Sequence, residues 1–367
     1  MANALDALTI KGFKSILELD NFKLNKLNVL IGANGAGKSN FIEIFRMLRA
    51  MMDQNFANYI LTNGGSDDFL FNGPKRTSSI LAQFCFDLNK YEFELEPTVS
   101  EKFVIKREAQ KYELGNWNII GFNQYESNLT AVKDIAGLTS KHGVGYYVYQ
   151  AISDWIVYHF HDTSSSAPMR RSEIVEDYKQ LRSNAANLAP FLLYLRTQQE
   201  KYYREIINVI QLVAPFFDDF ILEIVKKGEK DTVKLSWKQK ASDYPMQPYH
   251  FSDGTIRFIC LATALLQPNP PSTVVIDEPE LGLHPYAIEI LAELIQSAAE
   301  KTQLIISTQS PALIDCFSPN DIIVVNRKNG ASIFERLDTN ALTSWLEDYS
   351  LGELWRKNVV IGGPVRE

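Results

Sequence analysis

The segment GANGAGKS, residues 32–39, constrains the fold of this chain more than any other part of its sequence. An apolar run, Leu27–Ile31, precedes the segment. Phe41, Phe45 and Leu48 follow it at helical spacing. The pattern predicts a strand, a glycine-rich loop and a helix, and such a loop turns successive backbone N–H groups toward one anion at a helix N-terminus. We therefore expect an α/β fold that binds a phosphate group.

The residues of this loop have distinct expected roles. Lys38 would reach the β and γ phosphates of a nucleoside triphosphate, and the Ser39 hydroxyl would bind Mg²⁺. Because the loop has the required spacing and lies between a strand and a helix, we favour this interpretation over a glycine turn that only caps a helix. The other expected contributors to the nucleotide site are Asn34, Gly35, Ala36, Gly37 and Asn40.

A second motif is an apolar strand, Thr273–Ile276, that ends in Asp277 and Glu278. We expect Asp277 to hold the Mg²⁺ shell and Glu278 to orient and partly deprotonate an attacking water. Two acidic residues at the end of a strand are common, and the phosphate loop upstream is what favours the functional interpretation.

A third motif, Phe251–Thr255, is a Ser-x-Gly turn that enters a helix. A free hydroxyl and glycine N–H group at a helix N-terminus again form an anion site. Because the chain already has one such loop, Ser252 and Gly254 are expected to serve the nucleotide of a neighbouring molecule. The alternative is an ordinary helix cap at Ser252 or Asp253.

The motifs GANGAGKS, FSDGT, VVIDEPELGLHP and ISTQSP occur in this order. Together they resemble the ABC-type ATPases of the RecF and structural-maintenance-of-chromosomes (SMC) branch, and more closely its stand-alone bacterial RecF-like AAA-family members. The likeness extends to Leu8–Phe45 and to the tail Tyr349–Trp355. It implies a P-loop NTPase fold, namely an ABC-type ATPase head with an antiparallel β lobe and a short helical insertion. It also implies a head-to-tail dimer around two ATP molecules, with Mg²⁺ as the metal.

The resemblance assigns further residues. It implies that Ser252 and Gly254 contact the ATP of the opposite subunit. Lys14 and Ser15 match a family position near the nucleotide, although a solvated hairpin corner is the alternative. Gln309 stands where many such ATPases have a histidine that contacts the γ phosphate, and an amide can donate that hydrogen bond but cannot carry a proton charge.

The spacing of the histidines does not predict a metal site. His159 and His161 lie two residues apart at a strand end, and we favour no ligand role for that pair. The alternative is that His161 or Asp162 takes the water-binding or Mg²⁺-binding place of the family's glutamine loop. His284 precedes a proline at a helix start and is expected to be an interface or capping residue.

The remaining patterns outline three parts of the chain. Leu8–Ile16 is expected to be a strand bent at Gly12-Phe13, and residues 78–120 alternate as in an antiparallel β lobe. Residues 125–150 read as a loop with a poor helix, and the final third alternates strands and helices as in a parallel sheet. The expected parts are an N-terminal ATPase lobe (1–165), a helical insertion with return strands (166–245) and a C-terminal ATPase lobe (246–367).

The composition limits the cellular compartments and partners that we expect. The 367 residues carry a net charge of −7, which argues against a surface that is basic throughout. Three isolated cysteines indicate neither a disulfide framework nor a zinc site. No apolar opening segment resembles an export signal, and prolines break the longest uncharged stretch, Phe258–Ile276. We expect a cytoplasmic protein without a membrane partner, which disfavours a transporter subunit.

Two functions follow from these features. The first is an ATPase that dimerises around two ATP molecules and couples this to a DNA-associated or defence-system partner. The second is a low-turnover, ATP-dependent scaffold or sensor that gates a separate effector, either a toxin or a nuclease. Only 57 residues follow Ser310, so any effector is expected to be a separate protein. DNA is a further candidate partner through small basic sets such as Lys106-Arg107, Arg170-Arg171 and Lys226-Lys227, although we favour a solvated face as the interpretation of each set.

Overall fold

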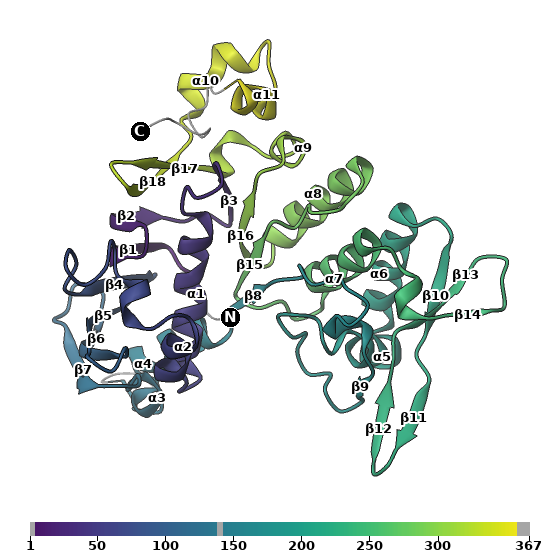
Figure 1. Cartoon of the computed structure of the whole chain (residues 1–367), viewed down its shortest axis with the longest axis horizontal. Helices are drawn as coiled ribbons and strands as arrows, with labels where there is room; N and C mark the ends of the chain where they lie inside the picture. Colours follow the sequence, from purple (N-terminus) through teal and green to yellow (C-terminus); the bar gives the residue numbers. More distant parts are fainter. Residues whose placement is uncertain (1–3, 138–141, 358–367) are drawn as a thin grey trace.

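A computed structural model describes residues 4–137 and 142–357 (Figure 1). A six-stranded sheet forms its centre, in the order β18-β17-β3-β16-β15-β8. The five strands from β17 to β8 pair in parallel, and β18 is antiparallel to β17. These strands are β3 (Leu27–Ile31), β8 (Ile156–Tyr158), β15 (Thr273–Asp277), β16 (Gln303–Thr308), β17 (Ile322–Lys328) and β18 (Ala331–Arg336).

Both faces of the parallel sheet are buried, because successive side chains of its strands enter different cores. Leu30 and Val275 pack into the core that contains helix α1 (Lys38–Met52). Val29 and Ile276 pack into the core that contains α7 (Asp253–Leu266) and α8 (Pro285–Ala299). This explains the uninterrupted apolar runs that the sequence shows at these strands. The parallel sheet predicted for the final third is confirmed.

An antiparallel sheet of six strands packs on the other side of α1 (Figure 1). Its order is β2-β1-β4-β5-β6-β7, so the β lobe predicted from residues 78–120 also takes up the first two strands of the chain. Helices α2 (Phe56–Thr62), α3 (Leu129–Val132) and α4 (Val144–Ser153) belong to this lobe. The strands are β1 (Ala7–Phe13), β2 (Ile16–Lys23), β4 (Ile80–Phe86), β5 (Asn89–Pro97), β6 (Phe103–Tyr112) and β7 (Asn118–Gln124).

Two expectations for this lobe are wrong in detail. Leu8–Ile16 is not one bent strand, because the chain reverses at Lys14-Ser15 and β2 pairs antiparallel with β1. Lys14 has a φ of 49°, which suits a tight turn. Residues 125–150 contain a regular helix, α4, whose Val148, Ala151 and Ile152 are buried at helical spacing.

The insertion combines helices with two small sheets and packs on α7 and α8 through a continuous apolar core. One of its strand pairs, β11–β12, projects away from the body as a hairpin (Figure 1). The helices are α5 (Leu188–Gln198) and α6 (Glu200–Val213), and the strands are β9 (Glu173–Ile174), β10 (Phe217–Ile221), β11 (Ile224–Lys227), β12 (Lys230–Val233), β13 (Ser236–Gln239) and β14 (Pro245–Met246).

The described residues end in short helices that lie beside β17 and β18 in Figure 1. The backbone N–H of Gly352 donates to Asp315 at 2.6 Å and fixes the tail to the helix that follows β16. Among the described residues, none of the helices is both long and apolar enough to cross a bilayer. These helices are α9 (Pro311–Ile314), α10 (Thr339–Leu346) and α11 (Leu351–Arg356), and the 3-10 turns of the chain are Ser66–Phe69, Pro168–Arg170, Pro248–His250 and Pro319–Asp321.

The order of the parallel sheet brings the sequence motifs together. β3, β16 and β15 are neighbours, and the loop of residues 32–39, Gln309 and Asp277 each follow or end one of these strands. Because parallel strands share one carboxyl edge, all three motifs lie at that edge. The topology therefore assembles one site from three distant parts of the sequence.

Candidate nucleotide-binding site

The loop between β3 and α1 has a backbone that requires glycine. Gly35 and Gly37 have φ angles of 79° and 115°, which side chains rarely tolerate. A Cβ on Gly37 would lie 2.0 Å from the Ser332 hydroxyl oxygen. In the described part of the chain no side chain caps the N-terminus of α1, so its first N–H groups are left for an anion. These features fit a phosphate cradle.

Lys38 lies in this cradle. Its Nζ donates to the carbonyl oxygens of Gly32 at 2.7 Å and Ala33 at 3.2 Å. Burial lowers the pKa of the Lys38 ammonium, while the carboxylates of Glu278 and Asp277 act in the opposite direction. The lysine expected to meet the phosphates therefore lies close to the two acidic residues that end β15. Asn34, Gly35 and Ser39 are exposed around it, and Ala36 is buried.

The turn between β1 and β2 is tied to the loop. Ser332 Oγ bonds to Ser15 Oγ at 2.7 Å and to the carbonyl of Ala36 at 2.5 Å. Asn40 Nδ2 donates to Ser15 Oγ at 2.7 Å. Ser15 and Asn40 are therefore placed to shape the loop. The ammonium group of Lys14 lies over the Phe69 ring, 4.3 Å from its centre.

Asp277 and Glu278 lie at the end of β15, both half-buried. The Ser307 hydroxyl donates to the Asp277 carboxylate, which orients it. The side-chain amide of Gln309 donates to Glu278 Oε1, and the backbone N–H of Glu278 donates to the carbonyl of Ser307 at 2.9 Å. Two neighbouring strands thus hold the expected water-activating acid, and Gln309 positions its carboxylate directly.

Glu280 also belongs to this site, although the sequence analysis did not single it out. It is 8% exposed, and its Oε1 accepts from the Thr308 hydroxyl and from the Gln309 backbone N–H. Its Oε2 has no hydrogen-bond partner among the described residues. Burial raises the pKa of the Glu280 carboxyl. Glu280 therefore anchors the segment that carries Gln309.

The Ser-x-Gly turn begins α7. Ser252 Oγ accepts from the backbone N–H of Thr255 at 3.1 Å, so Ser252 is a helix cap and is also exposed. A Cβ on Gly254 would lie 2.3 Å from the carbonyl oxygen of Gly282. The glycine therefore allows the start of α7 to pack against the loop that follows Glu278.

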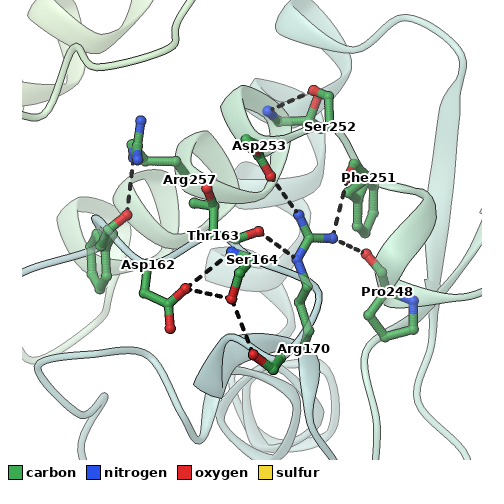
Figure 2. A network of polar contacts seen from close by, with 12 residues as sticks. Asp162, Thr163, Ser164, Arg170, Pro248, Phe251, Ser252, Asp253 and Arg257 are labelled. Carbon is green, nitrogen blue, oxygen red and sulfur yellow. Dashed lines mark hydrogen bonds and ion pairs between the residues drawn. The ribbon is translucent and has the colours of Figure 1, made fainter.

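A buried arginine holds the chain that enters α7 (Figure 2). Arg170 donates from Nε to the carbonyl of Thr163 at 3.1 Å and from Nη1 to those of Pro248 and Phe251. Its Nη2 pairs with Asp253 at 3.2 Å. Arg170 is thus a structural part of the Ser252 turn and is not available to a partner.

The histidines have different positions. Asp162 accepts from the N–H and hydroxyl of Ser164 in a local turn, and the exposed His161 lines a small opening beside Glu278. His284 accepts from the backbone N–H of Tyr286 and caps α8. Within the described part of the chain, no three metal-ligating side chains gather at one place. His161 is therefore the histidine that lies where it can contact water beside Asp277 and Glu278.

The residues at this edge fit a magnesium nucleotide. The loop has the glycine backbone and open helix N-terminus that phosphates require, and Lys38 supplies a cation. Ser39 and Asp277 offer the hydroxyl and carboxylate oxygens that Mg²⁺ prefers.

The family of the chain follows from comparison with known proteins. The family described as "AAA domain, putative AbiEii toxin, Type IV TA system" matches residues 27–315. The chain belongs to this family of P-loop ATPases. A curated relative, the tungstate uptake system ATP-binding protein TupC of Campylobacter jejuni, is 33% identical over 86 residues, which are 21% of this chain and 26% of TupC. The match thus spans about a quarter of that relative.

Solved structures identify the fold. The SMC head bound to the C-terminal winged-helix domain of ScpA has a TM-score of 0.60 and 16% identity, covering 93% of this chain and 99% of that one. A Pyrococcus furiosus SMC head with an extended coiled coil, bound to the C-terminal domain of ScpA, has a TM-score of 0.52 and 14% identity, covering 94% and 99%. The expected fold, an ABC-type ATPase head of the RecF and SMC type, is confirmed.

Proposed function

We propose that this chain hydrolyses ATP and closes as a head-to-tail dimer around two magnesium-bound ATP molecules. The observation that carries the proposal is the convergence of the phosphate loop, Asp277, Glu278 and Gln309 at one edge of the parallel sheet. Membership of a P-loop ATPase family supports ATP as the bound nucleotide.

The placement of Ser252 supports the dimer. α7 and α1 lie on opposite sides of the parallel sheet (Figure 1), and within the described chain no hydrogen bond joins the Ser252 turn to residues 32–39. The turn is exposed and already capped. A second subunit is therefore the natural source of a phosphate for it, and a closed two-fold pair gives each subunit the same contact.

The hydrolytic step assigns one task to each residue. Lys38 and the loop N–H groups bind the phosphates, and Ser39 and Asp277 would hold Mg²⁺, which neutralises phosphate charge. Glu278 accepts the proton of the attacking water while Gln309 holds its Oε1. Ser252 and Gly254 bind the γ phosphate of the opposite subunit.

The test compares binding with turnover. We expect Lys38→Ala to lose most ATP affinity in calorimetry, because the phosphates lose a fixed cation. Glu278→Gln is the matched variant: it should bind ATP and Mg²⁺ like the wild type and hydrolyse it at least about 100-fold more slowly. Equal affinity and turnover in Lys38→Ala would refute the assignment.

A second candidate is a low-turnover scaffold that gates a separate effector. The description of the family to which this chain belongs includes a toxin of a toxin–antitoxin system. The SMC heads that this chain resembles are bound to ScpA domains. We propose a separate protein partner on this basis. Steady-state phosphate release of less than about one per hour, with a stable ATP-bound dimer, would favour the scaffold over the ATPase motor.

DNA is the weaker partner proposal. Lys106 and Arg107 pair with Glu96 and Glu92, and Arg170 is buried, so these basic residues are already occupied. The exposed lysines of the β11–β12 hairpin, including Lys226 and Lys227, are the better candidates for a phosphate backbone.

A further inference from the structure

Arg257 is a second buried arginine, one turn beyond Gly254 on α7, and it joins three parts of the molecule. Arg257 exposes 8% of its surface to solvent. Its Nε donates to the carbonyl of Phe160 at 3.0 Å, its Nη2 to that of His161 at 3.1 Å, and its Nη1 to that of Leu281. Figure 2 shows it on the same helix as Ser252 and Asp253.

The carbonyls that Arg257 binds belong to two segments at the carboxyl edge of the parallel sheet. Phe160 and His161 follow β8, and Leu281 lies in the loop between Glu278 and α8. His161, Arg257 and Glu278 line the same small opening. Arg257 therefore connects the helix that carries Ser252 to the loop that carries the water-activating acid.

Close packing makes this connection stiff. Gly254 meets the carbonyl of Gly282, where a Cβ would lie at 2.3 Å, and a Cβ on Gly282 would lie 3.1 Å from Arg257 Nη1. Gly282 itself has a φ of 73°. The start of α7 and the loop after Glu278 therefore cannot shift independently without opening contacts at both glycines.

Burying a charged guanidinium in this space costs desolvation free energy. Burial lowers the pKa of Arg257, but an arginine stays charged in proteins. Among the described residues, its donors go to three backbone carbonyls and to no carboxylate. A planar group with fixed N–H directions defines the relative positions of its acceptors, which an apolar side chain of similar size would not do.

We propose that Arg257 is a positioning residue that couples the two nucleotide sites of the dimer. The inference rests on the proposed function, because Ser252 is taken to meet the ATP of the opposite subunit. A displacement of the loop after Glu278, caused by ATP in one site, is passed by Arg257 to the Ser252 turn that completes the other site.

The experiment measures ATP hydrolysis against ATP concentration for Arg257→Met, with Arg170→Met as the matched control. Arg170 is equally buried and also holds the Ser252 turn, but within the described residues it donates no hydrogen bond to Leu281 or Phe160. We expect a Hill coefficient near 2 in the wild type and near 1 in Arg257→Met. We expect kcat of Arg257→Met to fall at least about tenfold, with ATP affinity changed less than about threefold.

Arg170→Met should also lower kcat, because Asp253 and the Pro248 carbonyl lose a donor, yet keep the wild-type Hill coefficient. Arg257→Lys should recover part of the cooperativity, since an ammonium can still bind one or two carbonyls. If Arg257→Met does not fold, as seen by circular dichroism, Arg257→Gln takes its place in the comparison, and Arg257→Lys remains the variant expected to recover part of the cooperativity.

The outcomes separate the two proposals. A wild type that neither dimerises nor hydrolyses ATP overturns the proposed function and this inference with it. A cooperative wild type whose Arg257 variants keep the same Hill coefficient leaves the ATPase intact and overturns the coupling role. An equal loss of cooperativity in Arg170→Met would also overturn it, because any disturbance of the Ser252 turn would then suffice.

Discussion

The contact between Gly254 and Gly282 gives a sharp test of how the start of α7 is held. Replacing Gly254 with alanine would place a Cβ 2.3 Å from the Gly282 carbonyl oxygen, whereas real Cβ contacts stay above 3.0 Å. The obstructing atom belongs to the backbone, so no side chain can rotate away. The two segments must separate by about 0.7 Å, the difference between these distances.

The size of the effect follows from this separation. Overpacking a tight contact costs about 1–3 kcal/mol. If that cost falls on the closed, reactive state, hydrolysis slows by roughly 5- to 150-fold. Displacing a contacting group by about 1 Å has an effect of similar size, near 100-fold. The fold itself should survive, with a melting temperature lowered by no more than about 5 °C, because alanine favours helix more than glycine does.

The assay is ATP turnover together with thermal unfolding, and Thr255→Ala is the control. Thr255 lies next to Gly254 in the same turn, and alanine there removes one hydroxyl contact to Ser252 while keeping the N–H that Ser252 accepts. We expect this control to stay within about threefold of wild-type turnover. A Gly254→Ala variant with wild-type turnover would show that the packing of α7 on residues 281–283 is not needed for activity.

Three further predictions concern the site. Light scattering of Glu278→Gln with ATP and Mg²⁺ should show a persistent dimer, and a monomer throughout would contradict the proposed pair. Ser252→Arg alone should be inactive, but mixing it with Lys38→Ala should restore activity at one composite site; no recovery would place the turn in its own subunit. Burial raises the pKa of Glu280, so its contribution to stability is present at low pH and is lost as pH rises through the folded-state pKa. Glu280→Gln, compared by urea unfolding at pH 5 and pH 8, should therefore show a smaller loss of stability on going to pH 8 than the wild type.

The sequence predicted the elements whose pattern is local. The strand before residue 32, the helix after Lys38 and the strand that ends at Asp277 each show a clear apolar period, and all three form as expected. The bend expected at Gly12-Phe13 lies instead at Lys14-Ser15, the hairpin corner that was the alternative for these two residues, and the reversal uses a lysine at positive φ.

The roles of Glu280, Arg170 and Arg257 could not be predicted, because each depends on distant partners. Glu280 accepts from Thr308 and Gln309, and Arg257 binds carbonyls nearly a hundred residues away. A lone charged residue inside an apolar helix was the available signal for Arg257, since its position on α7 is otherwise flanked by Ile256 and Phe258. Such a residue in a buried helix calls for a partner, but the sequence does not say which one.

Under the proposed function, the same geometry accounts for an amide at position 309, where the resemblance implies a histidine in many ATPases. Gln309 is held from two sides: its backbone N–H donates to Glu280 and its side-chain amide to Glu278. An amide here orients the acid without competing for the proton that Glu278 is proposed to accept, whereas an imidazolium would stabilise the ionised carboxylate and make it a weaker base. We therefore expect Gln309→His to introduce a pH dependence near the histidine pKa of about 6.5 that the wild type lacks. A pH profile of turnover from pH 5.5 to 8.5 measures this, and identical profiles for the two proteins would mean that residue 309 does not act on Glu278 during hydrolysis.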